Sequence, residues 1–203
     1  MRRLVDIAIA ILVLVLLSPL FLVLSVLVIL DSPGHPFYGG WRIGKEGRTF
    51  RMWKLRTMVT GADRMGSAIT TKRDPRLTRL GVFLRRSKLD ELPQFFNLLL
   101  GDLTLVGPRP EDPGIAAHYT CEQRQILRVK PGITGPTQLR YTVLEAETIP
   151  QGAEAQQYYM DHILDQKLRL DLDYLGKRTA FSDLQVVSQT VLLIARSLMP
   201  SPR

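Results

Sequence analysis

The chain has 203 residues, of which 45% are hydrophobic and 23% charged, and its formal net charge at pH 7 is +8. This length fits one domain with a membrane anchor. A single cysteine excludes an internal disulfide, and three singly scattered histidines, none with a cysteine at a metal-site spacing, argue against a zinc site.

An uncharged apolar run of 24 residues spans positions 7–30. As a straight helix it would measure about 36 Å, enough to cross a hydrocarbon core of about 30 Å. It is too long for a cleavable signal peptide, and no small-residue cleavage site follows it. Ser18 and Pro19 divide it into halves of about 16 Å, each of which reaches the bilayer centre. Because Pro19 blocks the carbonyl of Val15, we expect a kink, with the Ser18 hydroxyl bonded to a freed carbonyl.

Two topologies remain open: a kinked helix that spans the bilayer, and a re-entrant hairpin that enters and leaves on one face. Arg2 and Arg3 precede the run and a basic segment follows it, so the positive-inside tendency places both ends in the cytoplasm. A spanning helix would leave the basic segment outside. We therefore expect a re-entrant membrane helix over 1–31, kinked at Ser18–Pro19, and a cytosolic, membrane-associated domain over 32–203.

The positive charge is concentrated between the apolar run and residue 90, since residues 31–90 carry 14 Lys and Arg against 5 Asp and Glu. Such an excess indicates an anionic partner: lipid headgroups, nucleotide phosphates or nucleic acid. Within it, residues 42–58 predict a short β-hairpin that turns near 45–47. Residues 60–76 are rich in Gly, Thr, Asp and Arg and predict a mobile loop.

Two helices are predicted around residue 90. The first covers Leu80–Arg86. In the second, the apolar residues of the segment 92–99 follow a helical period, and Gly101 is a suitable stop. Pro93 fits a first turn, which puts Asp90 and Glu91 near the helix N-terminus.

The rest of the chain alternates rigid loops with helices. Residues 107–110 and 130–138 are rich in Pro and Gly and predict loops, whereas residues 113–129 and about 151–176 predict helices. A final helix, capped by Ser182–Asp183, extends to about Leu198. We expect the apolar side of this helix to face the protein core rather than the membrane interface.

Asp171 and Asp173 are expected to lie on the surface of a helix, because residues two apart on a helix point in different directions and do not form one site. Taken together, the elements predict an α+β, mostly helical fold: a membrane hairpin, a small domain with a short β-hairpin, and amphipathic helices at the interface.

Asp90 and Glu91 are candidate site residues because of their neighbours. An adjacent carboxylate pair is by itself usually a solvated helix start. Here Arg85, Arg86 and Lys88 lie just upstream, and a helix N-terminus adds positive potential. A carboxylate beside cations and a divalent metal stays ionised and can act as a nucleophile or a ligand. Attack on a pyrophosphate needs such cations, because its oxygens repel an anion until they are neutralised.

Several motifs occur in a fixed order along the chain, and each is weak alone. They are Ser18-Pro19, Lys54–Met58 (KLRTM), Leu89–Gln94 (LDELPQ), Asn97, Gly101-Asp102, Val106–Pro110 (VGPRP) and Lys130–Gly135 (KPGITG). As an ordered set they are specific, and the chain resembles the monotopic phosphoglycosyl transferases, the bacterial sugar transferase family, over essentially its whole length.

The resemblance implies an active site at the cytosolic face of the bacterial inner membrane. It implies transfer of a sugar 1-phosphate from a UDP-sugar to a polyprenyl phosphate, undecaprenyl phosphate by expectation, with release of UMP, as the first membrane step of glycan assembly. Asp90 matches the nucleophile, which becomes a covalent phosphosugar aspartate, and Glu91 matches the second acid. Mg²⁺ is implied, with Asp90 in its coordination shell.

The resemblance also implies substrate-binding residues. Arg109 and Arg85 match positions expected to face phosphates, with Lys54 and Arg56 as further contributors. Gln138 keeps its register, although this chain has Pro136-Thr-Gln-Leu where many relatives have Trp-Ala-Gln-Val; the difference bears on the loop shape and on the sugar accepted. The chain lacks the extra N-terminal domain or membrane helices of larger relatives, so it resembles the minimal catalytic form.

Two other functions stay open. A single-pass protein could bind nucleic acid or anionic lipid through its basic region. Few aromatic residues interleave the basic ones and no nucleic-acid motif is recognisable, so nucleic acid is not an expected partner. An inactive scaffold of glycan assembly has no need of an intact carboxylate pair and arginine loop. The expected partners are a UDP-sugar, a polyprenyl phosphate and membrane lipid.

Overall fold

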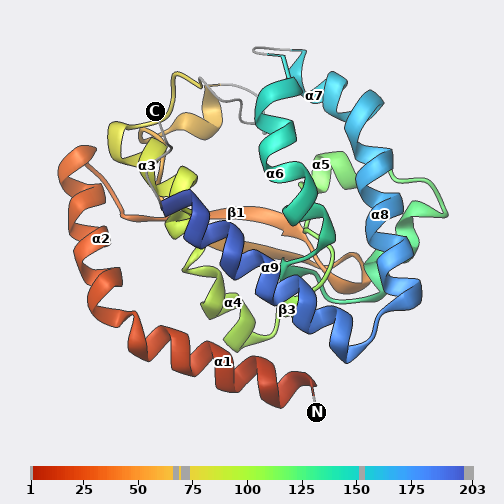
Figure 1. Ribbon diagram of the computed structural model, residues 1–203. Helices are drawn as coiled ribbons and strands as arrows, with labels where there is room; N and C mark the ends of the chain where they lie inside the picture. Colours follow the sequence, from red (N-terminus) through yellow and green to blue (C-terminus); the bar gives the residue numbers. More distant parts are fainter. Residues whose placement is uncertain (1, 66–68, 70–73, 151–153, 199–203) are drawn as a thin grey trace.

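The computed structural model describes residues 2–65, 69, 74–150 and 154–198. Helices predominate and two small sheets lie among them, which confirms the expected mostly helical α+β class. Figure 1 shows the first two helices bordering one side of the molecule, with the last helix crossing the front and the strands behind it.

The apolar run forms two helices, α1 (Arg2–Leu16) and α2 (Ser18–Asp31), bent by 62° at their junction. The expected kink is confirmed, because Pro19 lies in the first turn of α2 and Ser18 Oγ donates to the carbonyl of Val15 at 2.8 Å. In the part of the chain that the structure describes, no single helix is long and apolar enough to cross a bilayer. The bent pair meets that test only when both halves are taken together, by length and composition.

A β-hairpin follows, made of β1 (Phe37–Ile43) and β2 (Thr49–Leu55) in antiparallel register. It turns at η1 (Lys45–Gly47), as predicted. The first strand begins before residue 42, however, because Gly39 and Gly40 belong to it. Aromatic rings cover both glycines: an added Cβ would lie 3.0 Å from Trp53 and 3.2 Å from Tyr38. A pair of glycines is a weak strand signal unless such neighbours are known.

The two helices predicted around residue 90 are confirmed. They are α3 (Arg79–Ser87) and α4 (Gln94–Leu100), joined by a 3₁₀ turn, η3 (Leu89–Glu91). Thr78 Oγ1 caps α3 by accepting from the Gly81 N–H at 3.0 Å. Lys88, with φ 60°, ends α3, and Gly101, with φ 94°, ends α4. Asp90 and Glu91 therefore lie in the turn directly before α4.

A second sheet pairs β3 (Thr104–Val106) with β4 (Gly132–Thr134) in parallel. This pairing brings the loops at 107–110 and 130–135 together. A Cβ on Gly132 would lie 2.1 Å from the Gly107 nitrogen, so the two backbones approach too closely for any side chain there.

The helix predicted over 113–129 is wrong. The segment holds a four-residue helix, α5 (Pro113–Ala116), and a 3₁₀ stretch, η4 (Gln123–Arg128). Thr120 and Gln123 exchange bonds between side chain and backbone N–H, at 2.9 and 3.2 Å. This capping box starts a new turn inside the segment. A further helix, α6 (Pro136–Thr148), begins within the predicted loop at 130–138, with proline at its first position.

The helix predicted near 151–176 is confirmed from residue 155 onward. It consists of α7 (Ala155–Tyr158), a π-helical turn, η5 (Tyr159–Ile163), and α8 (Leu164–Lys177); residues 151–153 lie outside the described part. The main core gathers where these helices meet. Its buried residues are Ile115, Ala116, Tyr119, Ile126, Tyr141, Ile149, Ala155, Tyr159, Ile163, Leu164 and Leu168.

The last helix, α9 (Ala180–Leu198), corrects two expectations. Thr179, not Ser182, is its cap, because the Ser182 N–H donates to Thr179 Oγ1 at 3.0 Å. The helix was also expected to bury its apolar side. Instead Leu184 and Val191 are 64% and 60% exposed. The helix rests on the fold through Val186 and Thr190, so its broader apolar side faces outward.

The loop predicted over 60–76 contains a 3₁₀ turn, η2 (Ala62–Arg64), and a buried ion pair. Arg76 Nη2 lies 2.6 Å from Asp74 Oδ2, and its Nη1 donates to the carbonyl of Ala62. Both ends of the loop are thus tied together, while residues 66–68 and 70–73 lie outside the described part. Its mobility remains a prediction.

Candidate active site

Asp90 lies at the joint between α3 and α4 and is 3% exposed. Its Oδ1 atom is buried and has no hydrogen-bond partner among the residues that the structure describes. Burial raises the pKa of this carboxyl above its ordinary value, and the nearby charge of Glu91 adds to the rise. Lys54, Lys88 and Arg85 act in the opposite direction.

Glu91, the next residue, has the opposite surroundings. Its Oε1 accepts from Lys54 Nζ at 3.2 Å and from Arg109 Nη2 at 3.3 Å. Burial alone would raise the pKa of Glu91, but the charges of Lys54 and Arg109 outweigh it and hold the pKa well below the usual range. Two neighbouring carboxyls with diverging pKa values are typical of an active site in which each has a separate task.

Three cations from separate elements surround this pair. Lys54 comes from β2, Arg85 from α3 and Arg109 from the loop after β3. Burial lowers the pKa of Lys54 and of Arg85, and the two carboxylates oppose that shift. The structure therefore brings together five of the residues predicted from sequence: Asp90, Glu91 and these three cations.

Asn97 fixes the distance between the pair and β2. It is fully buried on α4, and its amide replaces a missing strand partner: Oδ1 accepts from the Trp53 N–H and Nδ2 donates to the Arg51 carbonyl, at 3.0 and 2.7 Å. Nδ2 also donates to Asp102 Oδ2. Both polar ends of a buried amide are thus satisfied, which locks α4 to the strand that carries Lys54.

The loop that carries Arg109 is held by contacts with α8, η5 and β1. Glu111 Oε1 accepts from Lys167 Nζ at 3.1 Å and from the Tyr159 hydroxyl, and the Glu111 carbonyl accepts from the Ile43 N–H at 2.9 Å. Burial would raise the pKa of Glu111, but the Lys167 charge and both hydrogen bonds lower it. This network keeps the arginine loop in one position.

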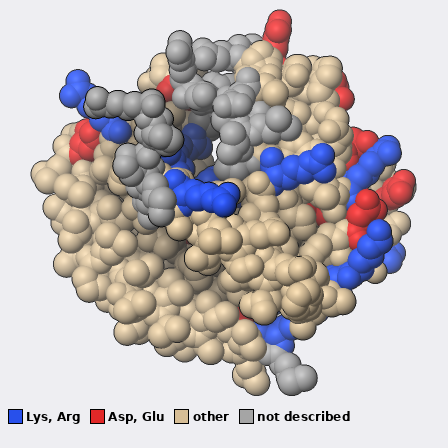
Figure 2. All heavy atoms as spheres, in the orientation of Figure 1, with Lys and Arg blue, Asp and Glu red and all other residues tan. Residues whose placement is uncertain are grey.

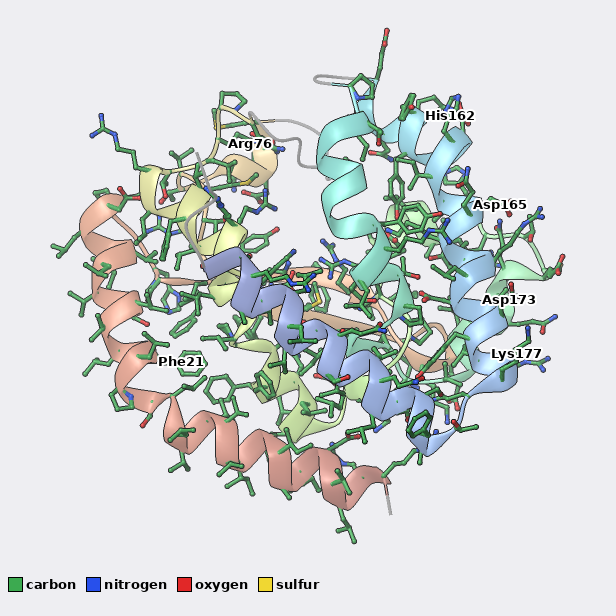
Figure 3. The ribbon with its side chains drawn as sticks, viewed as in Figure 1. Phe21, Arg76, His162, Asp165, Asp173 and Lys177 are labelled. Atoms are coloured by element: carbon green, nitrogen blue, oxygen red, sulfur yellow. The ribbon has the colours of Figure 1, made fainter. Side chains whose placement is uncertain are left out.

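Asp171 was expected at the surface, and this prediction is wrong. The residue is 3% exposed, and burial raises its pKa to about 6, against hydrogen bonds from Thr137 and from the Arg109 backbone. Asp173 points away from α8 into solvent, as Figure 3 shows. The missed signal is the spacing of Lys167 and Asp171, which places both on the buried stripe of α8 beside Leu164 and Leu168.

Two predicted binding residues have other contacts. Arg56 donates to the carbonyls of Ser32 and Pro33 and to Thr60 Oγ1, so it lies at the turn after α2. Gln138, in the first turn of α6, donates from Nε2 to the Gly132 carbonyl at 3.4 Å. Their roles in substrate binding remain predictions.

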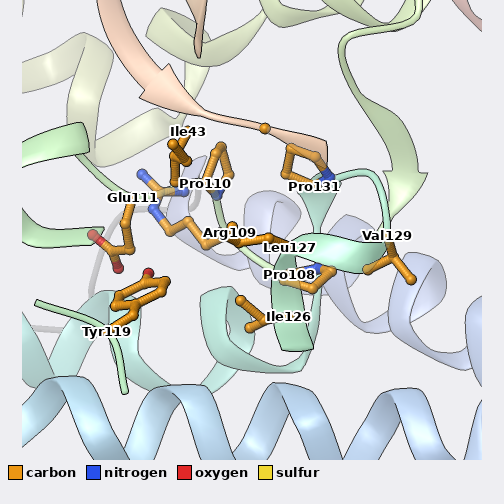
Figure 4. Close-up of a pocket in the computed structure, with 11 residues that line it drawn as sticks. Ile43, Pro108, Arg109, Pro110, Glu111, Tyr119, Ile126, Leu127, Val129 and Pro131 are labelled. Atoms are coloured by element: carbon orange, nitrogen blue, oxygen red, sulfur yellow. The ribbon is translucent and has the colours of Figure 1, made fainter. Parts of the chain in front are cut away.

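A shallow pocket opens beside Arg109 (Figure 4). Its walls are apolar apart from the Arg109, Glu111 and Tyr119 side chains. The lining residues are Ile43, Gly44, Pro108, Arg109, Pro110, Glu111, Tyr119, Ile126, Leu127, Val129 and Pro131. The same arginine thus borders the pocket and contacts Glu91.

The donor set suits a magnesium ion that also binds a substrate. Mg²⁺ is commonly held by one or two carboxylates together with substrate phosphates and water. Asp90 Oδ1 is a buried oxygen without a donor and fits one such position, whereas Glu91 Oε1 already accepts from two cations. Across residues 2–65, 69, 74–150 and 154–198, no group of three or more His, Cys, Asp or Glu side chains could form a cage from protein alone.

Comparison with known proteins gives matches along the whole chain. A family model described as bacterial sugar transferase matches residues 1–197. A putative undecaprenyl-phosphate N-acetylgalactosaminyl 1-phosphate transferase of Bacillus subtilis is 41% identical over 145 residues, covering 69% of this chain and 77% of that protein.

Two further relatives cover more of the chain. The UDP-glucose:undecaprenyl-phosphate glucose-1-phosphate transferase of Escherichia coli is 33% identical over 94% of this chain, which spans only 39% of that protein. The exopolysaccharide production protein PSS of Rhizobium leguminosarum is 34% identical over 95% of this chain and 94% of its own length.

Proposed function

This chain belongs to the bacterial sugar transferase family, and from that membership we propose that it transfers a sugar 1-phosphate from a UDP-sugar to undecaprenyl phosphate, releasing UMP. The names of the relatives support the donor and acceptor classes. The observation that carries the proposal is the buried Asp90, which has one unpartnered oxygen and lies next to Glu91, an anion paired with Lys54 and Arg109.

In the first step, Asp90 attacks the phosphorus that carries the sugar. A bond forms between its carboxylate oxygen and that phosphorus, the bond to the bridging oxygen breaks, and UMP leaves with the electron pair. Lys54, Arg85 and Arg109 would bind the diphosphate and offset its charge, because an anionic nucleophile is otherwise repelled. Glu91 orients Lys54 and Arg109 by accepting from both.

Mg²⁺ when bound, with Asp90 and substrate oxygens as ligands, would supply charge that stabilises the phosphate oxygens and the departing UMP. In the second step, an oxygen of the lipid phosphate attacks the phosphosugar on Asp90. The bond to Asp90 breaks, the free aspartate is restored, and the product is a lipid diphosphate-linked sugar. Attack by Asp90 first and the lipid second gives a two-step exchange.

We also propose that residues 1–31 form a re-entrant hairpin and that residues 32–203 lie at the cytosolic face of the inner membrane. Both ends of the hairpin contact the same body: Arg3 donates to carbonyls of α4, and Asp31 accepts from the Leu80 N–H of α3. A spanning helix would separate its ends by about 30 Å of hydrocarbon. Lipid would cover the exposed apolar side chains on both arms, which include Leu4, Leu12, Val15, Leu16, Leu22, Val23 and Leu30.

Topology can be tested with single cysteines at Arg2 and His35, in a chain whose Cys121 is replaced by serine. A membrane-impermeant thiol reagent should spare both positions in intact cells and label both in inverted vesicles. Labelling of one position from each side would contradict the hairpin and leave the chemistry standing.

The activity can be tested by UMP release. With Mg²⁺, undecaprenyl phosphate and a panel of UDP-sugars, the protein should release UMP from at least one donor. Asp90→Asn should lower that rate by about 10³-fold or more, because a neutral amide is not a nucleophile. Asp173→Asn, an exposed residue on α8, is the matched control. Full activity in Asp90→Asn would remove Asp90 from the reaction.

A further inference from the structure

The start of α1 is bound to the end of α4. Arg3 donates from Nη1 to the Leu98 carbonyl at 2.5 Å and from Nη2 to the Leu99 carbonyl at 2.6 Å. The last carbonyls of a helix lack partners within it, so a guanidinium fork there is a C-terminal cap. It comes from a helix more than 90 residues earlier in the chain.

One turn later, Asp6 binds the strand that follows α4. Its Oδ2 accepts from Thr104 Oγ1 at 2.8 Å, and its Oδ1 from the Leu105 N–H at 3.1 Å. Asp6 is 7% exposed, and the ten residues of α1 that follow it are all apolar. Burying a carboxylate costs free energy unless it is hydrogen-bonded, and the bonds to Thr104 and Leu105 supply this compensation.

The other arm of the hairpin holds α3 in the same way. Asp31 Oδ2, at the end of α2, accepts from the Leu80 N–H at 3.1 Å, one of the unpaired donors in the first turn of α3. Leu24 and Val28 of α2 are buried against Leu84 of α3. At the bend, the Phe21 ring packs on Phe96 of α4, with centroids 6.1 Å apart, as Figure 3 shows for Phe21.

Each arm of the hairpin therefore binds one of the two helices, α3 and α4, that flank the turn with Asp90. The arm α1 holds the C-terminal end of α4, and α2 holds the N-terminal end of α3. Between them lies η3, whose own bonds are two 3₁₀ contacts, Glu91 N–H to the Lys88 carbonyl at 3.2 Å and Leu92 N–H to the Leu89 carbonyl at 3.3 Å. So short a turn cannot by itself fix the angle between its two helices.

We propose that the bent hairpin is a clamp that sets the α3–α4 angle, and that Arg3, Asp6 and Asp31 are positioning residues for Asp90 and Glu91. The lipid-facing part of the protein then acts on the reaction through the carboxylate pair, in addition to anchoring the chain. The effect on catalysis rests on the proposed transferase function; the effect on the turn does not.

The test compares Asp31→Ala with Asp31→Asn in the full chain, in lipid nanodiscs. Asparagine keeps an oxygen that can accept from the Leu80 N–H, whereas alanine does not. Asp31 is exposed, so the fold should survive either change. Thr179→Ala is the matched control, because it removes a helix cap of the same kind from α9, a helix that does not carry the carboxylates.

The first readout is hydrogen exchange at the amides of residues 88–92, followed by mass spectrometry. Alanine at 31 should speed their exchange about tenfold while α8 keeps its protection, and asparagine should restore it. The second readout is the rate of UMP release, which should fall about tenfold with KM for the UDP-sugar changed less than twofold, because misplaced groups slow the step rather than loosen binding.

Asp6→Asn tests the contact made by the other arm. The double variant Asp6→Asn/Asp31→Ala should lower the rate of UMP release by less than the product of the two single-variant factors, because loss of either contact already allows the α3–α4 angle to change. Unchanged exchange at 88–92 in Asp31→Ala, or a change no larger than in Thr179→Ala, would overturn the clamp. If the exchange responds but the parent protein releases no UMP from any donor, the clamp stands and the transferase proposal fails.

Discussion

At the scale of single residues, the main feature is the contrast between Asp90 and Glu91. They are adjacent in sequence, but Glu91 accepts from two cations and Asp90 Oδ1 accepts from none. Glu91 is therefore held as an anion that organises the cations. The unpartnered oxygen of Asp90 suits the proposed role of nucleophile, because a carboxylate bound by several donors is a weaker nucleophile than one with an unpartnered lone pair.

The pH dependence of UMP release should report on Asp90. In the proposed mechanism the ionised carboxylate is the reactive form, so the rate should be lost as pH falls through a pKa that burial has raised above the ordinary 3.8. Lys54→Met removes a charge that lowers this pKa, so the acid limb should move to higher pH. Lys45→Met, in the hairpin turn, should leave it in place. A limb that stays fixed or moves down in Lys54→Met would contradict this assignment.

Asp171 should make stability depend on pH. Its folded pKa of about 6 lies above the ordinary 3.8, so its contribution is fully present below 3.8 and is lost as pH rises through about 6. Asp171→Asn removes this loss, and relative to the parent it should gain about 2 kcal/mol of unfolding free energy between pH 4 and pH 7. Thermal unfolding in detergent measures the difference in Tm. Asp173→Asn should show no such trend, and an equal trend in both would refute the buried carboxyl.

Sequence reasoning found the residues of the carboxylate pair and its cations because ordered motifs surround them. It missed Asp171 because a charged residue on a polar-looking helix is usually exposed, and Asp171 is buried among partners distant in sequence, Thr137 of α6 and the Arg109 loop. Arg56 was assigned to substrate by its motif, whereas its donors go to the turn after α2. Long-range partners decide such cases, and a local pattern does not contain them.

At the scale of elements, local signals predicted what local interactions determine. The bend at Ser18–Pro19, the turn at 45–47 and the stop at Gly101 each follow from one or two residues. The prediction of one helix over 113–129 was wrong because a capping box at Thr120 begins a separate 3₁₀ stretch there. The expected burial of the apolar side of the last helix was wrong because burial depends on what the helix packs against, and the hydrophobic period of its sequence does not reveal that.

The bend is expected to depend on Ser18 and Pro19. Replacing both by alanine restores the amide donor to the Val15 carbonyl and removes the ring clash, a change of about 3 kcal/mol towards a straight helix. In the cysteine-labelled chain, position 35 should then become accessible from the outside in a fraction of molecules. Leu22→Ala, on the exposed side of α2, is the control. Labelling identical to the parent would show that the bend is set elsewhere.

At the scale of the whole molecule, most of the exposed large apolar residues lie on α1, α2 and α9. Figure 2 shows few charged side chains over the lower and left parts of this face, where α1 and α2 lie in Figure 1. Lys and Arg side chains lie beside a hollow in the upper part, and side chains of both charges mix at the right-hand margin. The helix α9 crosses the front of the molecule in this orientation (Figure 1), and several of its apolar residues are exposed. They include Phe181, Leu184, Val191 and Leu192. The overall class was predictable from the sequence; this arrangement depends on where α9 crosses the fold.

The apolar side of α9 should contribute to membrane binding. Leu184→Glu combined with Val191→Glu should lower partition into anionic vesicles about tenfold or more, measured by flotation. Gln185→Glu with Gln189→Glu adds the same charge to exposed polar positions of the helix and should have a much smaller effect. An equal loss in both double variants would mean that charge alone, and not burial of α9 in lipid, governs binding.

The most direct test is the mass of the protein after it meets a donor without an acceptor. Incubation with Mg²⁺ and a UDP-sugar that it turns over should add the mass of one sugar phosphate, and fragmentation should place it on Asp90, with no addition in Asp90→Asn. If UMP appears only when the lipid phosphate is present, and no phosphosugar is ever found on the chain, the group passes directly from nucleotide to lipid and Asp90 is not its carrier.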